Sequence, residues 1–142
     1  MLNYEASSLL TSICYCLLEA VYHEQKETTP PVISKIKEYL TENYADDLTL
    51  ERLSQSFFLS KSYLQKQFKK YIGISPWDYL LQLRMTEVKR LLRTSDFSVH
   101  EIAWRVGFND VSYFVQVFRN LEKITPLQYR ILWTSNQLPF SN

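Results

Sequence analysis

The chain contains one sequence unit twice, and this internal repeat limits the possible folds more than any other feature. When Tyr63 is aligned with Tyr113, similar or identical residues pair fifty positions apart, as Phe68 does with Phe118. Upstream of the turn the offset falls to forty-nine, as for Leu53 and Ile102, so the second copy contains one extra residue at its turn. Self-similarity of this kind indicates two structural units of the same type in tandem.

Within the second copy, two apolar helical stripes flank a break at residues 107–110. We expect both stripes to face inward, the first formed by Ile102, Ala103 and Val106 and the second by Phe114, Phe118 and Leu121. Gly107 can adopt the positive φ of a tight bend, and Asp110 can cap the next helix. The pattern predicts a helix-turn-helix motif. In the first copy Phe58 replaces Gly107, so that turn either avoids a positive φ or is strained by roughly 1 kcal/mol.

The predicted fold class is all-α, with two helix-turn-helix subdomains joined by a long linker helix. Only two glycines occur, and both lie at predicted helix ends or turns. Three Trp, eight Phe and ten Tyr supply ample apolar mass for a core. A helix at residues 76–92 would be a rigid spacer about 25 Å long. The other helices are expected at about residues 32–43, 50–56, 60–71, 99–106, 110–121 and 126–133.

The domain organisation follows from breaks in the helical pattern. Residues 1–27 predict an additional amphipathic helix, and residues 28–31 form a linker because consecutive prolines interrupt a helix. The tandem domain then occupies residues 32–133, and residues 134–142 form a frayed tail. The first helix either packs on the tandem domain or belongs to another domain. Cys14 and Cys16 would point to different sides of that helix, and we interpret them as reduced thiols.

Basic residues are concentrated in one region, although the net charge of the chain is only +1. Residues 60–93 contain eight Lys/Arg against two Asp/Glu, whereas residues 1–59 contain four against nine. On the helix predicted at residues 60–71, Lys66, Lys69 and Lys70 lie opposite the apolar stripe. The helix predicted at residues 110–121 has Arg119 and no Lys. The charge distribution therefore favours a basic surface on the first copy.

The two copies resemble the two helix-turn-helix motifs of the AraC/XylS transcription regulators. The second copy carries the resemblance with IAWRVGFNDVSYFVQVFR and then TPLQYR, and the first with LTLERLSQSFFLSKSYLQKQFKKYIGISPWDYL. The resemblance covers about residues 32–130. It implies a homeodomain-like DNA-binding domain of about seven helices, whose recognition helices at residues 60–71 and 110–121 enter successive major-groove segments. It also favours residues 1–27 as the last helix of a sensing or dimerising domain outside this chain.

Outward positions on these helices match those that read bases in family members. Gln can pair with adenine, Lys can donate to guanine, and Tyr can contact a thymine methyl group. Base reading is assigned to Ser62, Gln65, Lys66, Ser112, Tyr113 and Gln116. Phosphate contact, which positions the protein without specifying a sequence, is assigned to Thr49, Lys61, Lys69, Lys70, Ser98 and Arg119. Tyr63 is left open between a core position and an outward one.

Other classes of function find less support in the sequence. Only His23 and His100 could serve as imidazole bases, and neither has a nucleophile at a recognisable spacing, so we do not expect an enzyme. Cys14, Cys16 and His23 offer three irregularly placed ligands where a structural zinc site needs four. We therefore expect no metal and no cofactor. The alternative that stays open is a helical protein-interaction module whose basic face binds an acidic partner.

The predicted partners are double-stranded DNA and RNA polymerase, with any effector bound by a domain absent from this chain. No apolar run reaches the roughly 18 residues of a membrane-spanning helix, and the N-terminus lacks the basic start of a secretory signal. We therefore expect a cytoplasmic protein with no membrane partner. The sequence leaves open the operator, the target genes, the effector and whether binding activates or represses.

Overall fold

The computed structural model describes residues 28–137, and the helix expected within residues 1–27 lies outside this range. The chain divides into two compact parts, Met1–Pro30 and Pro31–Asn142. The second part contains both copies of the repeat, which are called the first unit and the second unit. Over residues 28–137 the structure is helical and contains no strand. This confirms the predicted all-α class.

Seven helices follow one another in the described range: α2 (Pro31–Glu42), α3 (Leu50–Ser56), α4 (Lys61–Ile72), α5 (Pro76–Thr94), α6 (Val99–Arg105), α7 (Val111–Glu122) and α8 (Pro126–Gln137). The differences from the predicted helices lie at their ends. α2 begins at Pro31, the last residue of the predicted linker, because proline suits the first position of a helix. α8 continues past Trp133, so residues 134–137 are helical rather than frayed. No Gly or Pro interrupts the chain between Pro126 and Pro139, which explains the longer helix.

A side-chain oxygen caps the start of every helix from α3 to α8. Each accepts a hydrogen bond from the backbone N–H three residues later, which is worth roughly 1 kcal/mol. The caps are Thr49, Ser60, Ser75, Ser98, Asp110 and Thr125. The cap predicted at Asp110 is thus confirmed. The breaks in the sequence pattern therefore do fix where the helices start.

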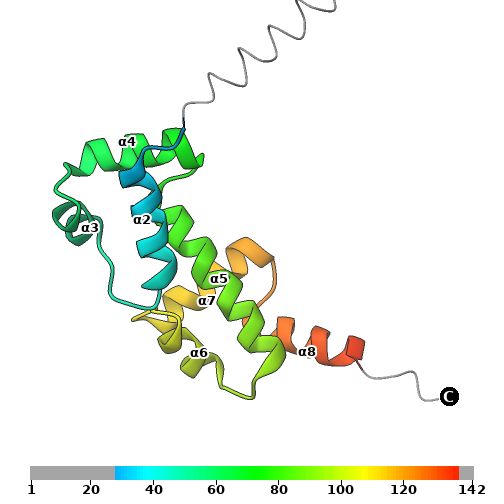
Figure 1. Ribbon diagram of the computed structural model, residues 1–142. Coiled ribbons are helices and arrows are strands. Elements are labelled where there is room, and N and C mark those ends of the chain that lie inside the picture. The colour runs from blue at the N-terminus through cyan, green and yellow to red at the C-terminus, as the bar shows by residue number, and fades with distance from the viewer. Residues whose placement is uncertain (1–27, 138–142) are drawn as a thin grey trace, which may run out of the picture. The chain divides into compact units, whose positions relative to one another are not determined.

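Two hydrophobic cores form, one for each copy of the repeat, and α5 contributes to both. The first core contains Ile33, Ile36 and Leu40 of α2, Leu53 of α3, Leu64 and Phe68 of α4, and Leu80 of α5. The second contains Met85, Val88 and Leu92 of α5, together with Ile102, Val106, Phe114 and Phe118. Figure 1 shows α2, α3 and α4 around one end of α5 and α6, α7 and α8 around the other. The spacer predicted from sequence is therefore a structural part of both units.

Both turns adopt a positive φ, at +54° for Phe58 and +99° for Gly107. Of the two alternatives for the first turn, the strained one is therefore correct. The backbone also enters the left-handed region after each recognition helix, at Gly73 with φ +95° and at Lys123 with φ +67°. Each copy thus has glycine at one of the two bends and a larger residue at the other.

Candidate nucleic-acid interface

α4 buries one face and presents a polar face to solvent. Leu64 and Phe68 are fully buried in the first core. The three residues assigned to base reading on this helix, Ser62, Gln65 and Lys66, are all exposed. A packed aromatic residue thus fixes the helix while its opposite side stays accessible. The side chains that could read base edges are held on a rigid element.

α7 repeats this arrangement with a different polar face. Phe114 and Phe118 are fully buried, and Ser112, Tyr113 and Gln116 are exposed. The prediction that Leu121 faces inward is wrong, since 54% of it is exposed. Phe118 packs edge-on against Tyr129 of α8, but Leu121 lies in the last turn of α7, one residue before the helix ends. Helical periodicity places Leu121 on the same face as Phe118, but in the last turn of α7 this face is no longer buried.

Tyr63 and Tyr113 occupy equivalent positions in the first turns of α4 and α7. They are 49% and 46% exposed, so Tyr63 is an outward residue rather than a core residue. Sequence reasoning left Tyr63 open and omitted it from the base-reading set. Its pairing with Tyr113 in the repeat was the signal that could have included it.

The basic surface is narrower than the charge count suggested. Of the eight basic residues in 60–93, Arg84 is buried, and Lys61, Lys89 and Arg90 form ion pairs with Glu51, Glu122 and Glu87. Nζ of Lys61 lies 2.9 Å from Glu51 Oε1, so a phosphate would compete with that carboxylate. An exposed pair of this kind is worth no more than roughly 1 kcal/mol.

The remaining phosphate candidates on the recognition helices lie at the surface. Lys69, Lys70 and Arg119 are exposed, and Nζ of Lys70 lies 5.0 Å from the centre of the Tyr71 ring. On α4, Lys66, Lys69 and Lys70 are thus exposed, whereas Arg119 is the exposed basic residue of α7. Positive charge is concentrated on α4 far more than on α7.

The two helix N-termini assigned to phosphates differ in their environment. Thr49 Oγ1 accepts from the Arg52 backbone N–H at the start of α3. Ser98 forms a capping box at the start of α6, in which its backbone N–H donates to Glu101 Oε2 at 2.8 Å. That backbone hydrogen bond is the main cause that lowers the pKa of Glu101. The Glu101 carboxylate therefore already accepts from the Ser98 backbone N–H, and a phosphate at this helix start would compete with it.

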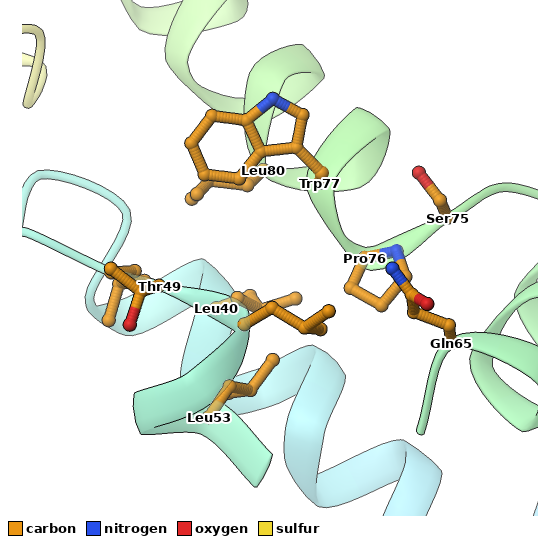
Figure 2. A pocket seen from close by; sticks show the side chains of 10 residues that line it. Leu40, Thr49, Leu53, Gln65, Ser75, Pro76, Trp77 and Leu80 are labelled. Atoms are coloured by element: carbon orange, nitrogen blue, oxygen red, sulfur yellow. The ribbon is translucent and has the colours of Figure 1, made fainter. Parts of the chain in front are cut away.

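An apolar pocket of about 230 Å³ lies beside the recognition face of the first unit. Its lining includes two of the predicted site residues, Thr49 and Gln65, together with Trp77, which sequence reasoning missed (Figure 2). Figure 2 shows Gln65 next to Ser75 and Pro76 at the start of α5. Trp77 is 48% exposed, and its repeat equivalent Leu127 is 56% exposed. Trp77 lies outside the buried apolar stripe of α5, and this position was the sequence signal that could have identified it as a surface residue.

The pocket is smaller than the roughly 300–1,000 Å³ typical of small-molecule sites. Within residues 28–137 no three His, Cys, Asp or Glu residues come together as metal ligands. No helix in that part of the chain is both long and apolar enough to cross a membrane. The features that stand out in the described structure are thus the two outward polar faces.

Comparison with known proteins gives a consistent assignment. A family model described as a helix-turn-helix domain matches residues 53–131. The uncharacterised helix-turn-helix transcriptional regulator YdiP of Escherichia coli is 36% identical over 137 residues, covering 90% of this chain and 45% of that protein. The chain spans less than half the length of the curated relatives that it matches.

Two solved structures extend the comparison. The C-terminal domain of the two-component response regulator yesN from Fusobacterium nucleatum is 46% identical, with a TM-score of 0.66, over 68% of this chain and 95% of that one. The DNA-binding domain of AdpA, solved with a target DNA, is 26% identical, with a TM-score of 0.70, over 74% of this chain and 95% of that one. The chain therefore belongs to the AraC/XylS family of helix-turn-helix, DNA-binding transcription regulators.

Proposed function

We propose that residues 31–137 bind an asymmetric duplex site, with α4 and α7 reading two successive major-groove segments. The observation that carries this proposal is the repeated exposure of polar side chains at equivalent positions of two helices anchored by buried Phe68 and Phe118. An α-helix fits the major groove, where each base pair shows a distinct pattern of donors and acceptors. The relatives are DNA-binding regulators, so the rival module for an acidic protein partner is not favoured.

The base-reading residues have different chemistry in the two units. Lys66 would donate to guanine O6 and N7, and Gln65 and Gln116 would each pair with adenine N6 and N7. Tyr113 would contact a thymine methyl group, and Ser62 and Ser112 can donate or accept. Because Tyr63 is as exposed as Tyr113, we add it to this set.

The phosphate contacts fall mainly on the first unit. Lys61, Lys69 and Lys70 on α4 would neutralise phosphates, whereas α7 contributes Arg119. Thr49 and Ser98 would present helix N-termini to the backbone. Since each neutralised phosphate steepens the salt dependence of binding, the first unit would supply most of that dependence.

α5 separates the recognition helices α4 and α7, and its length is close to, but shorter than, one turn of the duplex. α5 has 19 residues and, at about 1.5 Å per residue, is about 28 Å long. Successive major-groove segments on one face of straight DNA repeat at about 34 Å. Simultaneous insertion of α4 and α7 would therefore favour a bent site, at a deformation energy that depends on sequence.

The complete regulator would extend beyond this chain. We propose that a sensing or dimerising domain precedes residues 28–31, that it binds any effector, and that the regulator contacts RNA polymerase in the cytoplasm. Support comes from the relatives, which are more than twice as long as the matched region.

Selection from a random duplex library, followed by binding at two salt concentrations, tests the proposed DNA reading. The expected result is an enriched site with two motifs about one helical turn apart. A protein that enriches no sequence, and whose binding disappears as salt rises, would contradict base reading. A shuffled duplex of equal composition serves as the control, because phosphate contacts alone would bind both alike.

A further inference from the structure

Arg84 is a buried arginine in the middle of α5, and only 5% of it is exposed. Its Nε donates to the Tyr44 carbonyl oxygen at 2.7 Å, and its Nη2 donates to the Asp46 carbonyl oxygen at 3.0 Å. Both carbonyls belong to the loop between α2 and α3, in the first unit. Burial is the main cause that lowers the pKa of Arg84. A guanidinium in this position is costly unless its donors are satisfied, and these carbonyls satisfy two of them.

The second unit meets the same guanidinium from another side. The Phe108 ring centre lies 5.5 Å from the Arg84 Cζ, within cation–π range. At Gly107, a Cβ would lie 2.9 Å from Arg84 Nη2 and 2.9 Å from the Ala45 carbonyl oxygen. The turn before α7 therefore lies directly against Arg84 and against the backbone of the first unit.

Few other features connect the two units in the described part of the chain. Each pair of helices with extensive contacts in that range either lies within one unit or includes α5. Tyr44 packs against both hydrophobic cores, and its pKa is raised mainly by burial. The joint thus consists of α5, the loop around Tyr44, Arg84 and the turn at residues 107–108.

This joint leads directly into the second recognition helix. Phe108 packs against the rings of Phe114 and Tyr113, with ring centres 5.1 and 6.2 Å apart, and Asp110 caps α7. A movement of the turn would consequently move α7. On the other side, the loop held by Arg84 ends at Thr49, the cap of α3, and α3 contacts α4.

We propose that Arg84 is a positioning residue that fixes the separation and rotational phase of α4 and α7, and thereby sets the base-pair spacing between the two halves of the DNA site. The proposal rests on the proposed two-helix reading of DNA. Arg84 would touch no base itself. It acts by fastening the loop of one unit to the turn of the other.

Arg130 provides a matched control inside a single unit. Its Nε donates to the Leu92 carbonyl oxygen at 3.1 Å and its Nη2 to the Ser95 carbonyl oxygen at 3.2 Å. The chemistry is the same as at Arg84, but both acceptors lie at the end of α5, in the second unit. Replacing Arg130 should loosen α8 without altering the relation between α4 and α7.

The test uses the full chain and the site selected above, with one or two base pairs inserted or removed between its motifs. Arg84→Met, Arg84→Lys and Arg130→Met are compared with the unmodified protein, and thermal melting is recorded for each. The unmodified protein should lose roughly tenfold or more in affinity per shifted base pair, as for a mismatched position. Both Arg84 variants should reduce that penalty to about threefold or less, while Arg130→Met keeps it.

Each outcome decides between positioning and simple stabilisation. A uniform loss of affinity at every spacing, with the penalty unchanged, would overturn the proposal even if melting falls. Should Arg84→Met not fold, Arg84→Lys decides alone, because lysine keeps the charge without the planar fork that reaches two carbonyls. If neither variant folds, Arg84 maintains the fold as a whole and the positioning role fails. A failure of the proposed function looks different, because the unmodified protein would then select no two-part site.

Discussion

The two copies of the repeat make the same pair of bends with glycine in opposite places. At the bend before the recognition helix, the first unit has Phe58 and the second has Gly107. At the bend after it, the first unit has Gly73 and the second has Lys123. All four residues have a positive φ, although glycine adopts that region far more readily than phenylalanine or lysine. The fold, not the residue, sets the backbone conformation.

What differs between the bends is the space around each one. Phe58 is 95% exposed, and a Cβ added at Gly73 would meet nothing within 4 Å. At Gly107 the Ala45 carbonyl and Arg84 leave no room for a Cβ. Lys123 keeps its side chain at the surface and donates from Nζ to the Asn120 carbonyl oxygen at 3.0 Å. Glycine is thus required sterically at the bend where the two units meet.

The largest effect should come from the core of the second unit. Phe118→Ala should lower the free energy of unfolding by about 3–5 kcal/mol, because it removes a fully buried ring. Denaturant unfolding measures the loss, and hydrogen exchange locates it in α6–α8 more than in α2–α4. Phe68→Ala should show the converse pattern. An unchanged unfolding curve would contradict the buried assignment.

The two glycines should respond unequally to the same substitution. Gly107→Ala should destabilise the protein by about 2–4 kcal/mol, because a left-handed backbone penalty adds to overpacking against the first unit. Gly73→Ala meets open space and should cost about 1–2 kcal/mol from the backbone alone. Thermal unfolding of both variants tests the difference. Equal losses would show that the contact with Ala45 does not matter.

The equivalent outward residues Lys66 and Gln116 should both contribute to specificity, although they differ in charge. Lys66→Ala should cost about 1–3 kcal/mol on the selected site and relax the preference at one position. Gln116→Ala should relax a position in the other motif without changing the salt dependence. Titrations on the selected site and on random duplex separate these effects. Equal losses on both duplexes would argue against base reading.

The smallest predicted effect is a gain in stability at the first turn. Phe58→Gly should raise the free energy of unfolding by about 0.5–1 kcal/mol, because it relieves the left-handed strain and sacrifices little packing. The midpoint of denaturant unfolding, measured against a neutral surface substitution such as Gln55→Ala, would reveal it. A lower midpoint would mean that the exposed ring makes a stabilising contact.

Much of the local structure could be predicted because it depends on local rules. Apolar periodicity and cap residues located all seven described helices, and the repeat paired their buried faces. The same rules placed the six base-reading candidates on the outside of α4 and α7, where the structure exposes them. Their contact with bases remains a prediction, because exposure alone does not identify a ligand.

The errors occurred where burial or ion pairing depended on contacts with other helices and loops. Arg84 counted as one of the basic residues of the first copy, although it lies buried at the joint. Leu121 fitted the apolar stripe but extends beyond the packed part of α7. Lys61 was included in the predicted basic surface, although its charge is paired with Glu51.

The sequence by itself determined that the protein has two similar helical units, where their helices begin, and which faces are apolar or polar. Those properties follow from periodicity, capping and repetition within a few residues of each position. Only the tertiary structure decided how the two units are joined. Arg84 reaches carbonyls that lie 40 and 38 residues away along the chain, and Gly107 approaches Ala45 across the same joint. Contacts between residues so far apart leave no mark in local periodicity, because they arise only when the two cores assemble on α5.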